Sequence, residues 1–123
     1  MVGEYVGRAL PLNAVVLTVI QSGSIRWYGH RTTLRWDLVA DERLDEAIGV
    51  LAAHEYEPYI LLEDYEESSF REHFARANIF GRIDWAPAIE YLGLGHVRLY
   101  AIADRARHLA GERILTHPIL APD

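Results

Sequence analysis

Apolar residues occur in short continuous runs and at helical spacing through the first half of the chain. Residues 14–20 read Ala-Val-Val-Leu-Thr-Val-Ile and residues 59–62 read Tyr-Ile-Leu-Leu. Runs without a polar face are typical of central, parallel strands that are covered on both sides. Between them, apolar residues recur at i, i+3, i+4, i+7 and i+8, which predicts an amphipathic helix. These residues are Leu44, Ala47, Ile48, Leu51 and Ala52.

Further elements are expected around these three. A short helix over residues 4–10 would lie in an N-terminal segment, residues 1–12, and residues 33–38 would form another strand. The sequence Asp64-Tyr65-Glu66-Glu67 has the spacing of a capping box with Asp64 as the cap, so a helix should follow it. Two strand–helix units in succession predict parallel strands joined by right-handed crossovers.

The pattern changes after Gly81. Residues 88–92 and 97–102 flank Gly93-Leu94-Gly95, which predicts a hairpin at an edge of the sheet. Residues 103–110 would add a helical turn, and residues 118–123 a loose tail. We therefore expect one α/β domain over residues 1–123. It should have three layers, a small and mainly parallel mixed sheet (Rossmann-like), and a C-terminal edge hairpin.

Composition limits the classes of function. Half of the 123 residues are hydrophobic and 24% are charged, as in one folded domain. The net charge of −6 argues against nucleic acid as a partner. There is no lysine and no cysteine, which excludes lysine Schiff bases, thiolate nucleophiles and disulfides. No apolar run approaches the roughly 20 residues of a membrane span, and no secretion signal is evident, so we expect a soluble chain.

A polar turn follows the first apolar run. In open α/β sheets, ligands bind at the carboxyl ends of the strands. Ser22, Gly23 and Ser24 would lie there at a helix start, where backbone N–H groups bind anions. Arg26 and Arg31 could add bidentate positive charge. The alternative is that Ser22 is an ordinary helix cap and Gly23 only permits the turn.

Acidic and aromatic residues supply weaker candidates. Asp37, Glu63 and Asp64 lie at predicted strand ends, a placement shared by metal-dependent phosphatases, but a structural role, such as Asp64 as a helix cap, explains them better. Trp85 lies in a turn beside Pro87, where its ring could stack on a sugar or else pack in the core. The six histidines form no His-x-x-x-His pair. We expect no catalytic residue, no metal and no cofactor.

Several stretches, in order and covering most of residues 12–114, carry a family resemblance. The first is Gln-Ser-Gly-Ser-Ile-Arg-Trp-Tyr-Gly-His-Arg-Thr-Thr-Leu-Arg-Trp-Asp at 21–37. Leu44-Asp45-x-Ala47-Ile48, a run over 56–74, Gly-Arg-Ile-Asp-Trp-Ala-Pro at 81–87, Val-Arg-Leu-Tyr at 97–100 and Asp104-Arg105 follow. Together they resemble the soluble C-terminal domain of bacterial membrane glycosyltransferases of the dolichyl-phosphate-mannose mannosyltransferase type (glycosyltransferase family 39-like).

The resemblance implies a soluble, non-catalytic accessory or recognition domain on the extracytoplasmic face of the membrane. Such a domain would help hold a lipid-linked sugar or an acceptor for a membrane-embedded transferase domain, which carries the catalytic acidic residues and has no counterpart here. The expected ligand-binding residues are Ser22, Gly23, Ser24, Arg26, Asp64 and Trp85.

Two alternatives stay open. One is a stand-alone phosphotransfer or hydrolytic enzyme, cytoplasmic in that case, that uses Asp37 and Asp64. The other is an interaction module that forms a homodimer through an exposed edge strand around residues 97–102.

Overall fold

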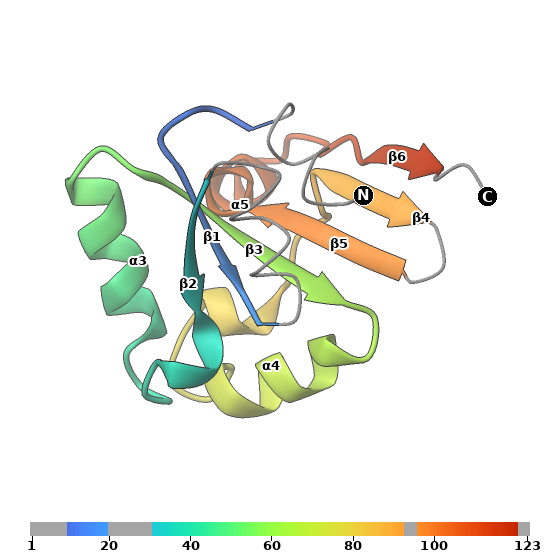
Figure 1. Cartoon of the computed structure of the whole chain (residues 1–123). Coiled ribbons are helices and arrows are strands. Elements are labelled where there is room, and N and C mark those ends of the chain that lie inside the picture. Colours follow the sequence, from blue (N-terminus) through green and yellow to red (C-terminus); the bar gives the residue numbers. More distant parts are fainter. Residues whose placement is uncertain (1–9, 20–30, 93–95, 121–123) are drawn as a thin grey trace.

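The computed structural model describes residues 10–19, 31–92 and 96–120, which form a six-stranded mixed sheet and three α-helices (Figure 1). The strands are β1 (Ala14–Thr18), β2 (Thr32–Arg35), β3 (Glu57–Glu63), β4 (Ile89–Leu92), β5 (His96–Ala101) and β6 (His117–Leu120). The helices are α3 (Leu44–Ala53), α4 (Glu66–Phe74) and α5 (Ile102–Leu109), with 3-10 turns η2 (Trp36–Leu38) and η3 (Phe80–Arg82). The predicted fold class, a single α/β domain with a mixed sheet, is confirmed.

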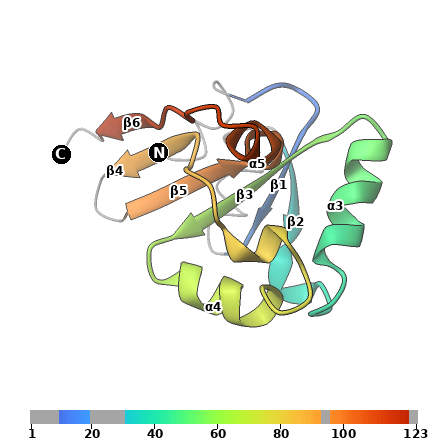
Figure 2. The ribbon, with the colours of Figure 1, turned by 180° about the vertical axis from the view of Figure 1, so that it is seen from behind.

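The strand order is β2-β1-β3-β5-β4-β6. β1 is parallel to β2 and β3, with Val16 opposite Tyr59, so the two apolar runs lie side by side in one direction as predicted. β5 is antiparallel to β3 and to β4, and β6 is parallel to β4. Figure 2 shows from behind that α3 lies toward the β2 side and β6 lies at the opposite side.

β1 is buried over its whole length, as its continuous apolar run predicts. Residues of alternate parity point to opposite faces of the sheet. Leu17 enters a core with Ile60 and Leu62, whereas Val16 enters a second core with Leu61. β1 therefore contributes to both faces.

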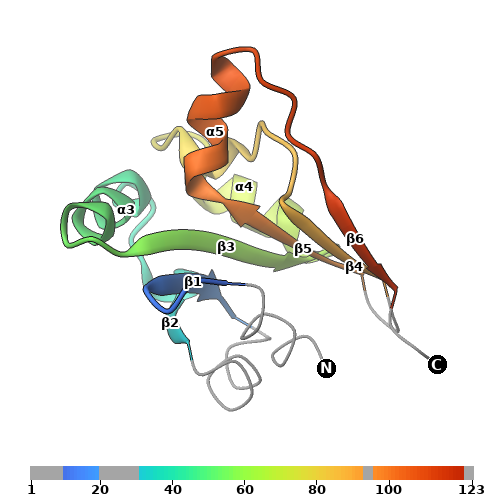
Figure 3. The same ribbon diagram turned by 90° about the horizontal axis from the view of Figure 1, so that it is seen from above.

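Helices α3, α4 and α5 all lie on one face of the sheet, where they cover the first of these cores (Figure 3). Trp36 packs edge-on against Phe70 and Phe74, with ring centroids 5.2 Å and 6.2 Å apart. On the other face, Leu10 packs against the second core. The helices predicted over residues 4–10 and after Ser22 lie outside the described residues, apart from Leu10. None of the described helices is long and apolar enough to cross a membrane.

The C-terminal hairpin forms as predicted but does not lie at the edge. β5 is inserted between β3 and β4, and β6 covers the outer side of β4. Residues 118–120, expected to begin the loose tail, thus belong to a strand, β6. Its Pro118 is tolerated because an edge strand has one side without a hydrogen-bonded neighbour. The prediction that residues 97–102 form an exposed edge strand is therefore wrong.

The second predicted strand is shorter than expected. It ends at Arg35 instead of residue 38, and a 3-10 turn follows. The reason is packing, because Trp36 is 7% exposed and enters the core against α4. Asp37 and Leu38 then turn away from the sheet as exposed residues.

Candidate functional site

The carboxyl ends of β1, β2 and β3 lie at one edge of the sheet because these strands are parallel. The chain places β2 on one side of β1 and β3 on the other, so the connection reverses direction at β1. This is where open α/β sheets bind ligands. The described part of this edge contains the end of β3, the loop residue Asp64 and the start of α4.

Arg98 is the centre of a polar cluster at this edge. Its Nη1 donates to Asp64 Oδ1 at 2.8 Å and to Glu67 Oε2 at 2.5 Å. Its Nε lies 3.6 Å from Glu90 Oε1. The ladders place Arg98 opposite Leu62 of β3 and opposite Glu90 of β4, which brings these distant segments together.

Two further side chains complete the cluster. Tyr100 Oη donates to Glu67 Oε2 at 3.0 Å, and burial together with the Glu67 charge raises the pKa of Tyr100. His96 Nε2 contacts Glu90 Oε1. Burial acts to lower the pKa of Arg98, but its hydrogen bonds to Glu67 and Asp64 raise it overall.

We call these six residues the Arg98 cluster: Asp64, Glu67, Glu90, His96, Arg98 and Tyr100. The alternation of His96, Arg98 and Tyr100 places three polar side chains on one face of β5, and this is the sequence signal that could have identified them. Which carboxylates they meet depends on the strand pairing, which has no local signal.

Exposure separates the carboxylates of the cluster. The Glu67 side chain is 12% exposed and the Asp64 side chain is 62% exposed. Glu67 accepts hydrogen bonds from both Arg98 and Tyr100 and lies 3.3 Å from the Arg71 Nη2, so it connects α4 to the sheet. Asp64 is held in place by Arg98 and still faces solvent. Its remaining lone pairs can accept hydrogen bonds from a ligand.

Asp64 does not act as the predicted helix cap. Helix α4 begins at Glu66, and its cap residue Tyr65 makes no side-chain hydrogen bond to the helix. The box is shifted by one residue, because the Glu66 carboxylate accepts the N–H of Glu63 at 2.9 Å. Burial raises the pKa of Glu66. The Asp64 carboxylate is drawn instead to Arg98, which sequence spacing does not indicate.

Trp85 lies in the core, so its ring offers no face for stacking on a sugar. It is 4% exposed, and its Nε1 donates to the carbonyl oxygen of Ala101 at 3.0 Å. The ring packs edge-on against Phe80 and Tyr100, with centroids 6.3 Å and 5.7 Å away. The aromatic neighbours and the hydrogen-bond partner of the indole explain why the turn position is buried. The prediction of a stacking surface at Trp85 is wrong.

Asp37 forms an ion pair with Arg35, two residues before it in the chain. Arg35 Nε and Nη2 donate to the two carboxylate oxygens at 3.1 Å and 2.6 Å, and these hydrogen bonds lower the pKa of Asp37. Asp37 and Asp64 are thus held by different arginines. Among the described residues, no group of three or more His, Asp or Glu side chains is placed to hold a metal ion.

The predicted anion-binding turn, Ser22, Gly23, Ser24 and Arg26, lies outside the described residues. Arg31, which was expected to assist it, donates from Nε to the carbonyl oxygen of Pro11 and from Nη2 to that of Leu10, both at 2.9 Å. Arg31 therefore connects the start of β2 to the segment before β1.

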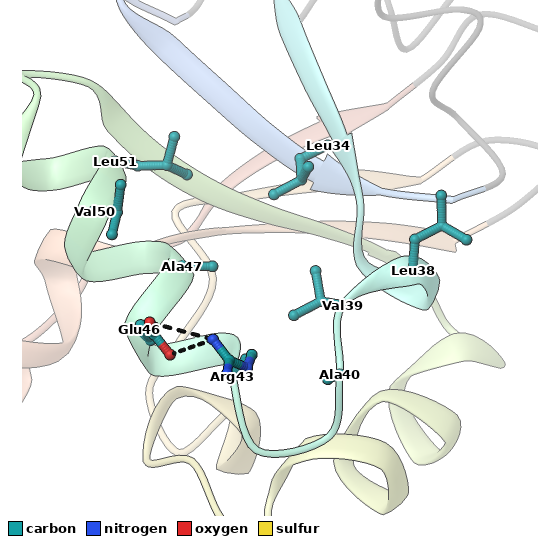
Figure 4. Close-up of a pocket in the computed structure, with 9 residues that line it drawn as sticks. All are labelled: Leu34, Leu38, Val39, Ala40, Arg43, Glu46, Ala47, Val50 and Leu51. Carbon is teal, nitrogen blue, oxygen red and sulfur yellow. Dashed lines mark hydrogen bonds and ion pairs between the residues drawn. The ribbon is translucent and has the colours of Figure 1, made fainter.

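A second surface feature is an apolar groove between β2 and α3, about 550 Å³ in volume (Figure 4). It is lined by Leu34, Leu38, Val39, Ala40, Arg43, Glu46, Ala47, Val50 and Leu51. Leu34, Leu38 and Val50 are 36%, 75% and 52% exposed. Sequence reasoning missed this groove, because it depends on the packing of α3 beside β2, which has no local signal in the sequence.

Comparisons with known proteins add no relative. No family model, no curated protein and no solved structure matches the chain.

Proposed function

We propose that this chain is a non-catalytic recognition domain, similar to the extracytoplasmic C-terminal part of a polyprenyl-phosphate-sugar-dependent membrane glycosyltransferase. It would contact the lipid-linked sugar or the acceptor through the carboxyl edge at Asp64. The observation that carries the proposal is the state of this carboxylate, which Arg98 holds at 2.8 Å while its side chain stays 62% exposed. A fixed and open carboxylate is a suitable acceptor for the hydroxyl groups of a sugar.

The neighbours of Asp64 extend this acceptor surface. Glu90 and His96 have side chains 29% and 31% exposed, so both reach solvent beside Arg98. Three carboxylates surround the guanidinium of Arg98, and one of them, Glu67, also pairs with Arg71, so the carboxylates outnumber the guanidinium groups. The excess of negative charge favours a neutral, hydroxyl-bearing group at this position over a phosphate.

The same contacts argue for binding rather than catalysis. A phosphotransfer enzyme of the alternative type would need Asp37 and Asp64 free to coordinate a magnesium ion. Each of these carboxylates instead binds an arginine, at 2.6 Å and 2.8 Å, and the positive guanidinium would repel a cation. We therefore favour a role in holding a ligand whose chemistry is performed elsewhere.

Backbone amide NMR tests the proposal. We expect titration with a short-chain, water-soluble polyprenyl-phosphate sugar to shift the amides of Glu63 to Glu67 and of His96 to Arg98. Asp64→Ala should weaken these shifts, whereas Asp37→Ala, which removes another arginine-bound carboxylate, should leave them unchanged. Shifts confined to another surface, or equal weakening by both substitutions, would refute the site.

A further inference from the structure

β2 has a free edge. Among the described residues it pairs only with β1, which leaves its outer side at the end of the sheet. The outward backbone N–H and C=O groups of such a strand can pair with another strand. The opposite edge, β6, differs because it includes Pro118, which has no N–H to donate.

The apolar groove is continuous with this edge. Leu34 belongs to β2 and also lines the groove, where it points toward α3 (Figure 4). The register places it beside Leu17, which is fully buried, yet Leu34 is 36% exposed. Val50 of α3 is 52% exposed on the facing wall. Covering these side chains would remove apolar surface from water, which favours association.

The charges beside the groove cancel. Arg43 and Glu46, the charged residues that line it, pair at 3.2 Å, so the lining carries one charge of each sign. The chain as a whole has a net charge of −6. Two copies of such a chain repel each other on average, whereas the paired charges that line this groove add no net repulsion. This ion pair also offers both signs to a symmetry-related copy.

We propose that β2 pairs antiparallel with β2 of a second copy of this chain, across a two-fold axis at Leu34. The two sheets would join into one, and each copy would cover part of the groove of the other. A two-fold interface uses the same surface twice and must be self-complementary, which a neutral rim around an apolar centre satisfies. In this register the two Leu34 side chains face each other, and Thr33 lies opposite Arg35.

Light scattering from micromolar to millimolar concentration tests this association. We expect a dimer that Leu34→Glu converts to a monomer with an unchanged circular dichroism spectrum. Leu120→Glu provides the matched control, because Leu120 is 76% exposed on the other edge strand, and it should leave the dimer intact. A wild-type chain that stays monomeric throughout, or a dimer lost only in Leu120→Glu, would overturn the proposal.

Cross-linking tests the register independently of stability. The chain has no cysteine, so Leu34→Cys introduces a single thiol. Residues directly opposite in an antiparallel pair have Cα atoms about 4.5 to 5.5 Å apart, within the range that a disulfide spans. We expect Leu34→Cys to form a covalent dimer on mild oxidation, and Leu38→Cys, in the groove but beyond β2, to form far less. Equal cross-linking of both would contradict the two-fold axis at Leu34.

Discussion

Asn78 and Asp45 connect the segment after α4 to the start of α3 by hydrogen bonds in both directions. Asn78 Oδ1 accepts the Asp45 N–H at 2.9 Å, and the Asp45 carboxylate accepts the N–H groups of Ile79 and Phe80 at 2.8 Å and 3.2 Å. Asn78 Nδ2 donates to two backbone carbonyls at 2.6 Å and 3.0 Å. At 2% exposure, the Asn78 side chain is buried with its polar atoms satisfied.

Asn78→Ala should therefore lower the free energy of unfolding by about 3 kcal/mol, because it removes a buried side chain and leaves the part-buried Asp45 N–H and Asp41 carbonyl without its hydrogen bonds. Asp45→Ala should cost less, since its bond to the Ile79 N–H lies in an exposed position that water can reach. Urea denaturation measures both. A loss under about 1 kcal/mol for Asn78→Ala would show that water replaces its hydrogen bonds.

Gly81 is a position where a methyl group has no room. A Cβ there would lie 2.6 Å from the Phe74 carbonyl carbon and 2.8 Å from the Ala75 nitrogen, both backbone atoms. We expect Gly81→Ala to destabilise the fold by about 2 kcal/mol or more. Gly49→Ala is the matched control, because nothing lies within 4 Å of its Cβ position in α3. It should stabilise the fold by about 0.5 to 1 kcal/mol. The midpoint of thermal unfolding should fall for Gly81→Ala and rise for Gly49→Ala.

Glu55, two residues after the end of α3, has a left-handed conformation with φ of 66°. Its N–H donates to Ala52 and the N–H of Tyr56 to Leu51, the bonds of a helix terminus that favours glycine. Glu55→Gly should thus raise the unfolding free energy by about 0.5 to 1 kcal/mol.

Ile83 is also left-handed, with φ of 46°, but is 6% exposed. Ile83→Gly should destabilise, because lost burial outweighs relieved strain. Stabilisation by both would contradict this ranking.

Acid stability should depend on Asp84. Hydrogen bonds from Arg105, at 2.9 Å and 3.1 Å, hold the pKa of Asp84 below its ordinary value. A carboxylate of this kind stabilises the fold above its unfolded-state pKa of about 3.9, and the stabilisation is lost as pH falls through the folded-state pKa. Asp84→Asn should therefore lower stability near neutral pH and flatten the loss below about pH 4. The midpoint of urea denaturation, measured from neutral pH to below pH 4, gives the dependence of stability on pH.

Glu66 provides a control, because its pKa is shifted in the opposite direction to that of Asp84. Burial raises its pKa, so its contribution is complete below the unfolded-state pKa of about 4.3 and is lost as pH rises through the folded-state value. Glu66→Gln keeps an oxygen for the Glu63 N–H and removes the buried charge. It should increase stability near neutral pH. A decrease there would mean that the carboxylate charge itself favours the fold.

The elements with strong local patterns could be predicted. The uninterrupted apolar run at β1 indicated a buried strand, and the spacing from Leu44 indicated α3. The capping box predicted at Asp64 does not form, because Arg98, distant in sequence, binds that carboxylate once β3 and β5 pair. Strand β6 was missed because Pro118 is unfavourable in a strand except at an edge, and no local signal indicates which strand is an edge.

The site was predicted less completely than the fold. Asp64 lies at the expected edge of the sheet, but the Arg98 cluster depends on the order of β3, β5 and β4. Trp85 was ambiguous in sequence because its turn position allowed exposure, and the ring of Tyr100 from β5 decides its burial. The pairing of strands that are distant in sequence therefore determines both the Arg98 cluster and the burial of Trp85.

In the proposed function, Asp64 helps to hold a lipid-linked sugar without transferring it. Phosphorus NMR of a short-chain polyprenyl-phosphate sugar, mixed with the protein, magnesium and an acceptor alcohol, reports binding and turnover in one sample. We predict broadening of the substrate resonance, weaker broadening with Asp64→Ala than with Asp37→Ala, and no product resonance over time. A product resonance that disappears with Asp64→Ala would show catalysis at this carboxylate, and an unbroadened substrate resonance would show that the sugar is not bound.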